Sequence, residues 1–112
     1  MENLLLLSVL FDYYGGLLRE NQQAVCDMYY NQNLSLAEIA MNLDISRQGV
    51  HETLKKAEHA LKHYEETLHL YEKNTRLTAI LEEVNALLQE SALSDYKKRR
   101  LAELTEQIGQ LI

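Results

Sequence analysis

Residues 34–50 read LSLAEIAMNLDISRQGV, and this stretch decides the fold of the chain. Ser35 is a suitable helix N-cap, and Glu38 stands three residues later, as a capping box requires. Ser46 is a second cap residue after a short turn, and it opens another helix. Two helices joined so closely predict a helix-turn-helix. The first of them carries its apolar side chains on one face: Leu36, Ile39, Ala40 and Leu43.

The second helix of this pair presents polar side chains at its start. Arg47 and Gln48 follow the cap directly, and a recognition helix offers such groups to guanine and adenine edges in a major groove. The alternative is an ordinary solvated helix face, and helix-turn-helices also dock proteins. Positions on the same exposed side complete the predicted nucleic-acid-binding surface, which consists of Ser46, Arg47, Gln48, His51, Glu52 and Lys55.

The recognition helix continues well beyond a minimal DNA-binding unit. Apolar residues step by four and three over three heptads, at Val50, Leu54, Ala57, Leu61, Tyr64, Leu68 and Tyr71. This seam predicts a helix that reaches about Glu72, followed by a polar junction at 73–76. The seam needs a partner helix, which belongs either to this chain or to a second copy.

Helices are expected along the rest of the chain as well. Residues 1–14 are apolar on more than one side and predict a mostly buried helix, which Gly15 and Gly16 end through a left-handed cap. A second helix is expected at 20–30, before a polar break at 31–33. A fifth is expected at 77–88 and, after a loop at 90–94, a sixth that Ser94 caps.

Together these elements define the predicted architecture. The fold class is all-α, a helix-turn-helix without a wing, with a long recognition helix and a C-terminal helical hairpin. Residues 1–73 form the helix-turn-helix domain. Residues 74–112 form a helical extension used for packing or dimerisation.

The charge balance limits the affinity expected for nucleic acid. The chain has 112 residues and a formal net charge of −6 at pH 7. Between Gln22 and Tyr64 it carries four cations and five anions. Because phosphate contacts by Lys and Arg supply most non-specific affinity, we expect a monomer to bind weakly and with strong salt sensitivity.

Several function classes lack support in the sequence. No apolar run is long enough to cross a bilayer, and the single cysteine, Cys26, fits a reducing cytosol. No phosphate loop, nucleophile elbow or paired-carboxylate pocket is visible. We therefore expect a cytoplasmic protein that is not an enzyme, with no cofactor, no metal, no small-molecule substrate and no membrane insertion.

Two further clusters have alternative interpretations. His59, His63 and Glu66 have helical spacing but lack a fourth metal ligand, so a solvated or partly packed role is favoured. The basic run at 97–100, KKRR, either contacts phosphate or is solvated and paired with acids such as Glu103.

Five segments between residues 7 and 73 carry a resemblance to a known family: Leu10–Gly15, Met28–Tyr30, Leu34–Ala40, Ile45–Gln48 and Leu68–Lys73. Together they resemble the YlxM family. These small cytoplasmic bacterial proteins are associated with the signal recognition particle, and their helix-turn-helix is similar to the promoter-reading fourth region of bacterial sigma factors.

The resemblance implies a helical fold, a dimer and a regulatory or accessory role linked to the genes of the targeting particle. It places Ser46, Arg47, Gln48, His51 and Glu52 where sigma-type recognition residues lie. The chain also departs from the family pattern. Members usually carry a hydroxyl residue and a lysine where it has Arg19 and Asn21, and alanine and tyrosine where it has Gly49 and His51.

Two functional hypotheses follow. The first is a nucleic-acid-binding regulator of the signal recognition particle pathway, which contacts DNA or RNA as a homodimer through the recognition helix or the hairpin. The alternative is an accessory factor that docks on the targeting GTPase or its RNA without binding specific DNA.

Overall fold

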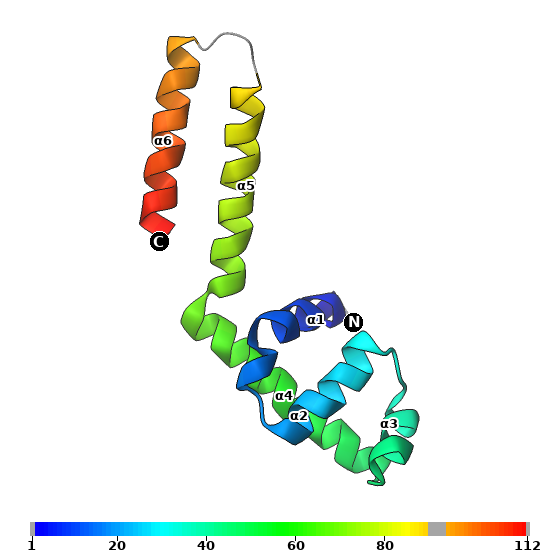
Figure 1. The fold of residues 1–112 in the computed structure, drawn as a ribbon. Coiled ribbons are helices and arrows are strands. Elements are labelled where there is room, and N and C mark those ends of the chain that lie inside the picture. Colours follow the sequence, from blue (N-terminus) through cyan, green and yellow to red (C-terminus); the bar gives the residue numbers. More distant parts are fainter. Residues whose placement is uncertain (1, 90–93, 112) are drawn as a thin grey trace. The chain divides into compact units, whose positions relative to one another are not determined.

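The computed structural model describes residues 2–89 and 94–111, which form helices and no strands (Figure 1). This confirms the predicted all-α class. The elements in chain order are α1 (Glu2–Tyr14), η1 (Gly15–Leu17), α2 (Glu20–Cys26), η2 (Asp27–Asn31), α3 (Leu36–Leu43), α4 (Arg47–Leu68), α5 (Leu70–Leu88) and α6 (Asp95–Leu111).

The chain divides into two compact units. The first ends at His69 and the second begins at Leu70. The boundary therefore lies four residues before the one expected from the sequence, which separated 1–73 from 74–112.

The N-terminal unit is built around α4. Helices α1, α2 and α3 all pack against α4, as Figure 1 shows. The first half of the predicted seam is buried in this unit, whereas Leu68 at its far end is 42% exposed. The buried side chains of the unit are Leu7, Leu10, Tyr14, Leu18, Val25, Cys26, Ile39, Ala40, Val50, Leu54, Ala57 and Leu61.

The first helix is less buried than its sequence predicts. Leu7, Leu10 and Tyr14 enter the core, but Leu5 is 76% exposed and Leu4 is 46% exposed. The expectation of a mostly buried helix is therefore wrong for this side of α1. Because α1 is apolar around its circumference and packs mainly on α4, its outer side chains stay in solvent.

Gly15 ends α1 in a different way from the predicted left-handed cap. No described glycine has a positive φ, and Gly15 instead starts the 3₁₀ turn η1. A Cβ on Gly15 would lie 2.8 Å from the Phe11 ring, so this position needs glycine for close packing.

The predicted second helix changes its winding halfway. Helix α2 ends at Cys26, and η2 continues as a wider π-helical turn in which the Gln32 amide donates to the Asp27 carbonyl at 3.1 Å. Side-chain hydrogen bonds from Asn31 and Gln32 lower the pKa of Asp27. The polar break predicted at 31–33 begins one residue later, because η2 includes Asn31, and its end at Asn33 has a φ of 59°.

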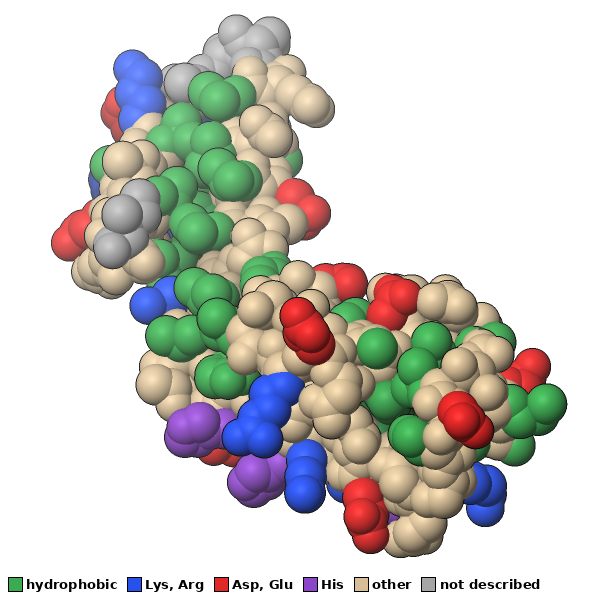
Figure 2. Space-filling view, turned by 60° about the horizontal axis from the view of Figure 1, so that its bottom comes forward, with side chains coloured by type: hydrophobic (Ala, Val, Ile, Leu, Met, Phe, Trp, Pro, Cys, Tyr) green, Lys and Arg blue, Asp and Glu red, His purple; other side chains and the backbone are tan. Residues whose placement is uncertain are grey.

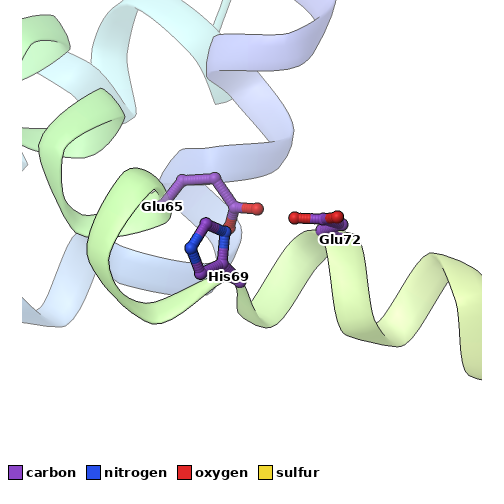
Figure 3. A group of neighbouring side chains, drawn as sticks. All are labelled: Glu65, His69 and Glu72. Carbon is purple, nitrogen blue, oxygen red and sulfur yellow. The ribbon is translucent and has the colours of Figure 1, made fainter. Parts of the chain in front are cut away.

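The prediction for the end of α4 is wrong. The helix ends at Leu68, His69 takes a left-handed φ of 56°, and α5 begins at Leu70 (Figure 3). The His69 amide donates to the Glu65 carbonyl at 2.8 Å, which satisfies one terminal carbonyl of α4. The predicted junction at 73–76 is helical, because its side chains are compatible with a continuing helix.

The C-terminal unit is the predicted helical hairpin of α5 against α6. Ile80 and Leu104 are its buried side chains among the described residues. The predicted cap is confirmed, since the Lys97 amide donates to Ser94 Oγ at 3.3 Å. The predicted loop lies largely outside the described residues, at 90–93. In the described chain, no helix combines the length and the apolar character needed to span a membrane.

Candidate nucleic-acid interface

The capping box predicted at the start of α3 is present. The Glu38 amide donates to Ser35 Oγ at 3.1 Å, and the Ser35 amide donates to Glu38 Oε1 at 2.9 Å. The hydrogen bond from the Ser35 backbone lowers the pKa of the Glu38 carboxyl. Ile39 and Ala40 then turn inward, which fixes α3 against α4.

The chain reverses sharply between α3 and α4. Asp44 has a left-handed φ of 54°, and the Ile45 amide donates to the Ala40 carbonyl at 3.1 Å. Ser46 caps the next helix, since its Oγ accepts from the Gly49 amide at 2.9 Å. The two predicted helices and their turn are therefore confirmed.

The predicted site residues lie along the first turns of α4, and each of them is exposed. The Ser46 hydroxyl is used as the cap. Gln48 Nε2 donates to Glu52 Oε1 at 3.4 Å, one turn further along. Lys55 Nζ lies 3.9 Å from Glu58 Oε2, yet the Lys55 side chain remains 65% exposed. Arg47, Gln48 and His51 border a shallow hollow with Leu36 at the start of α3.

The charges of α4 are sorted between its two sides. Glu58 and Glu65 are half-buried and accept hydrogen bonds from tyrosines of other helices, Tyr30 Oη at 3.3 Å and Tyr14 Oη at 2.6 Å. Burial, together with Glu58, raises the pKa of Tyr30, so this tyrosine stays a hydrogen-bond donor. The exposed side keeps four cations (Arg47, Lys55, Lys56 and Lys62) against two carboxylates (Glu52 and Glu66).

The exposed basic surface of α4 extends beyond the residues that the sequence singled out. Lys55, Lys56, His59 and His63 are exposed together on one side of α4. Figure 2 shows histidines gathered beside lysine or arginine side chains on this unit. The sequence contains a signal for this extension. Lysine or histidine recurs every four residues after Arg47, at residues 51, 55, 59 and 63, and residues four apart lie on the same face of a helix.

The two further clusters considered in the sequence are placed as follows. His59, His63 and Glu66 are exposed. A third group of acidic and histidine side chains lies near the end of α4: Glu65 is on its last turn, His69 follows the helix, and Glu72 belongs to α5 (Figure 3). The Glu65 carboxylate accepts a hydrogen bond from the Tyr14 hydroxyl, and this bond joins α4 to α1 beside the core. In the basic run at 97–100, Arg100 is bound to Glu83 and Glu103.

Comparison with known proteins identifies the family. A family model described as "Putative helix-turn-helix protein, YlxM / p13 like" matches residues 1–106. A UPF0122 protein of Desulforamulus reducens is 48% identical over 82 residues, which cover 73% of this chain and 70% of that protein. One of Caldanaerobacter subterraneus is 42% identical over 83 residues, covering 74% and 71%.

A relative of nearly equal extent confirms the assignment beyond the helix-turn-helix. The UPF0122 protein CPE1714 of Clostridium perfringens is 40% identical over 109 residues, which cover 96% of this chain and 97% of that protein. The resemblance found in the sequence is thereby confirmed. The chain belongs to the UPF0122 family of YlxM/p13-like helix-turn-helix proteins.

Proposed function

We propose that this protein binds double-stranded DNA through the first turns of α4 and acts as a regulator linked to the signal recognition particle pathway. One observation carries the proposal: the turn after α3 leaves Arg47, Gln48 and His51 exposed on a side of α4 where cations outnumber carboxylates. A duplex attracts such a surface through its phosphates. The family membership supports nucleic-acid binding by a helix-turn-helix, and the similarity of this motif to sigma-type recognition regions motivates the proposed regulatory role.

The proposed contacts follow from the order of residues along α4. The helix has 22 residues and a length of about 33 Å, so only its first turns fit into a major groove. Arg47 is suited to pair with guanine and Gln48 with adenine. Glu52 holds the Gln48 amide at 3.4 Å, and this interaction orients the amide before DNA arrives.

The salt dependence of binding gives a quantitative expectation. The exposed side of α4 carries four cations, and each phosphate contact contributes about −0.9 to the slope of log K against log salt. The slope expected for one protomer is therefore about −3.6 if all four cations contact phosphates. A slope near zero would contradict contact between this surface and a nucleic-acid backbone.

Selection from random duplexes at low salt tests the function. We expect an enriched motif, and Arg47→Ala should weaken binding to it by about 1–3 kcal/mol. Arg76→Ala is the matched control, because Arg76 is exposed on α5 in the other unit and should leave binding unchanged. Enrichment from RNA pools alone would move the proposal to RNA, and no enrichment from either pool would refute it.

A second candidate function is docking on the targeting GTPase or on its RNA. It is favoured by apolar exposure beside the turn, where Met41 is 82% exposed and Ile45 is 45% exposed. The net charge of −6 also suits a protein partner better than a polyanion. Titration of the purified, RNA-free GTPase tests this candidate. Binding that Met41→Asp abolishes and Arg47→Ala preserves would favour docking over DNA recognition.

A further inference from the structure

A hollow in the N-terminal unit lies between α1, η2 and the start of α3. Its volume is about 480 Å³, which is within the range of pockets that hold ligands, about 300–1,000 Å³. Figure 1 shows the first turns of α1 beside the end of α2 that continues into η2. This α1–α3 hollow is bordered by Leu4, Leu5, Tyr29, Tyr30, Leu34 and Glu38.

The apolar part of the lining is open to water. Leu5 is 76% exposed and Leu4 is 46% exposed, whereas Leu7 and Leu10 of the same helix are buried in the core. Leu34, which precedes α3, is only half-buried. Because burial of apolar side chains drives association, a concave surface of this kind favours a ligand with an apolar side of its own.

The tyrosine wall of the hollow is held in place by other elements. The Tyr29 and Tyr30 rings stand edge to face, with centroids 5.3 Å apart, and Tyr30 also lies 6.1 Å from the Phe11 ring of α1. The Tyr30 hydroxyl donates to Glu58 of α4 at 3.3 Å. The wall is therefore formed before a ligand arrives, which lowers the entropic cost of binding. Single π-helical turns such as η2 are frequent at functional sites.

Carboxylates dominate the elements around the hollow. Residues 2–46 contain six Asp or Glu residues and one basic residue, Arg19. Arg19 is the N-cap of α2 and lies at the opposite end of that helix from η2. Glu38 lines the hollow itself: its Oε1 accepts the Ser35 amide at 2.9 Å, whereas Oε2 accepts no hydrogen bond from the described residues. One carboxylate oxygen is thus available to a cationic ligand.

The basic side chains of α4 do not line this hollow. Arg47 and His51 border the separate hollow at the start of α4. Lys55 lies 3.9 Å from Glu58, the residue that accepts the Tyr30 hydroxyl. The charges that attract a polyanion to the exposed side of α4 are therefore missing from the border of the α1–α3 hollow. Because carboxylates repel phosphates, nucleic acid does not suit this site.

We propose that the α1–α3 hollow binds a basic amphipathic helix that belongs to another protein. The apolar face of this helix packs on Leu4, Leu5 and the tyrosine wall, and a Lys or Arg at its margin pairs with Glu38. A helix fits better than an extended peptide, because the described residues offer no strand edge with which a peptide could pair. The proposal concerns a different surface from the nucleic-acid interface and does not depend on it.

Titration of the isotope-labelled full chain with a synthetic peptide tests the proposal. The probe is an amphipathic helix of about 18 residues, five turns, with leucine on one face and lysine on the other. We expect amide shifts at residues 4–8 and 29–38, and binding that weakens as salt is added. The matched control peptide keeps the leucine face and replaces each lysine with glutamate, and it should not bind.

Two substitutions locate the contact. Leu5→Asn removes an exposed apolar anchor and should weaken binding of the basic peptide by about tenfold. Its control is Leu17→Asn, because Leu17 is 56% exposed on η1 and does not line the hollow. Glu38→Gln removes the charge, keeps a side chain that suits the capping box, and should weaken binding about two- to fivefold. Its control is Glu20→Gln at the exposed start of α2.

The outcomes are distinct. The proposal is overturned if the basic peptide does not bind, if the acidic peptide binds equally well, or if Leu5→Asn binds as tightly as the wild type. A change in the sedimentation mass of the chain alone in Leu5→Asn would assign the hollow to a second copy and would also overturn it. All four variants should bind a DNA duplex as the wild type does, so failure here leaves the proposed function standing.

Discussion

The two units of this protein are both helical, yet they differ in how much apolar surface they bury. In the described residues the N-terminal unit buries twelve apolar side chains, whereas the C-terminal hairpin buries two. The N-terminal unit wraps three helices around α4, so α4 is covered from several directions. The hairpin offers each helix only one neighbour within the unit.

This difference suits the two units to different tasks. A unit with a closed core can hold α4 rigidly and use the exposed side of α4 for a ligand. A hairpin with an open apolar side is incomplete by itself and is suited to association. Recognition and assembly are therefore expected to be separable by mutation.

The largest expected contrast is in thiol reactivity. Burial raises the pKa of the Cys26 thiol to about 12, against a reference of 9.0, so the thiolate fraction at pH 8 falls by about a thousandfold. A second thiol introduced by Ala86→Cys would be exposed on α5. We expect an alkylating reagent to modify the thiol at residue 86 at least a thousandfold faster than the thiol of Cys26. Peptide mass spectrometry measures both rates. Comparable rates would show that the N-terminal core is open.

Truncating a buried leucine should affect the two units differently. Leu61 is 0% exposed, and Leu61→Ala should lower the free energy of unfolding of the N-terminal unit by about 2–5 kcal/mol. Leu104, at 1% exposed, is the matched position in the hairpin, and Leu104→Ala should leave that transition unchanged. Chemical denaturation followed by tyrosine fluorescence measures both variants. Equal losses would mean that the two units unfold as one.

Glycine-to-alanine substitutions should change stability in opposite directions in the two units. Gly15→Ala places a Cβ 2.8 Å from the Phe11 ring and should cost about 1–3 kcal/mol through overpacking. Gly109 lies in α6 with no atom within 4 Å of an added Cβ, so Gly109→Ala should stabilise the hairpin by about 0.5 kcal/mol. Thermal unfolding by circular dichroism gives the sign of each change. If Gly15→Ala left the stability unchanged, the Phe11 ring of α1 would be free to move away from the added Cβ.

The smallest contrast is between the two serine caps. The Gly49 amide lies 2.9 Å from Ser46 Oγ, whereas the Lys97 amide lies 3.3 Å from Ser94 Oγ. Ser46→Ala should therefore cost about 1 kcal/mol, and Ser94→Ala less. Hydrogen exchange at the first turns of α4 and α6 detects both losses. A larger loss at Ser94 would reverse the order that these distances indicate.

Local signals in the sequence predicted the helix-turn-helix well. The capping pair of Ser35 with Glu38 and the cap at Ser46 depend on residues three apart, and both are present. The seam from Val50 to Leu61 was also correct, because a heptad pattern over a continuous helix directly reports its buried side.

Features that depend on tertiary contacts were not predictable. The end of α4 depends on one left-handed residue, His69, which has no sequence signature comparable to a glycine cap. The sorting of charge on α4 depends on Tyr14 and Tyr30, which reach Glu65 and Glu58 from other helices. Composition gives only a net charge, whereas these two contacts place two of the four carboxylates of α4 on its packed side.

The most direct test of the central claim is a titration of the isotope-labelled full chain with a non-specific DNA duplex at low salt, followed by amide chemical shifts. Because phosphate attraction needs no cognate sequence, the account predicts shifts on the exposed side of α4, between residues 47 and 62, and smaller shifts in Arg47→Ala, which removes one of the four exposed cations. Amides of residues 47–62 that stay unperturbed, while the duplex binds elsewhere or not at all, would contradict the account.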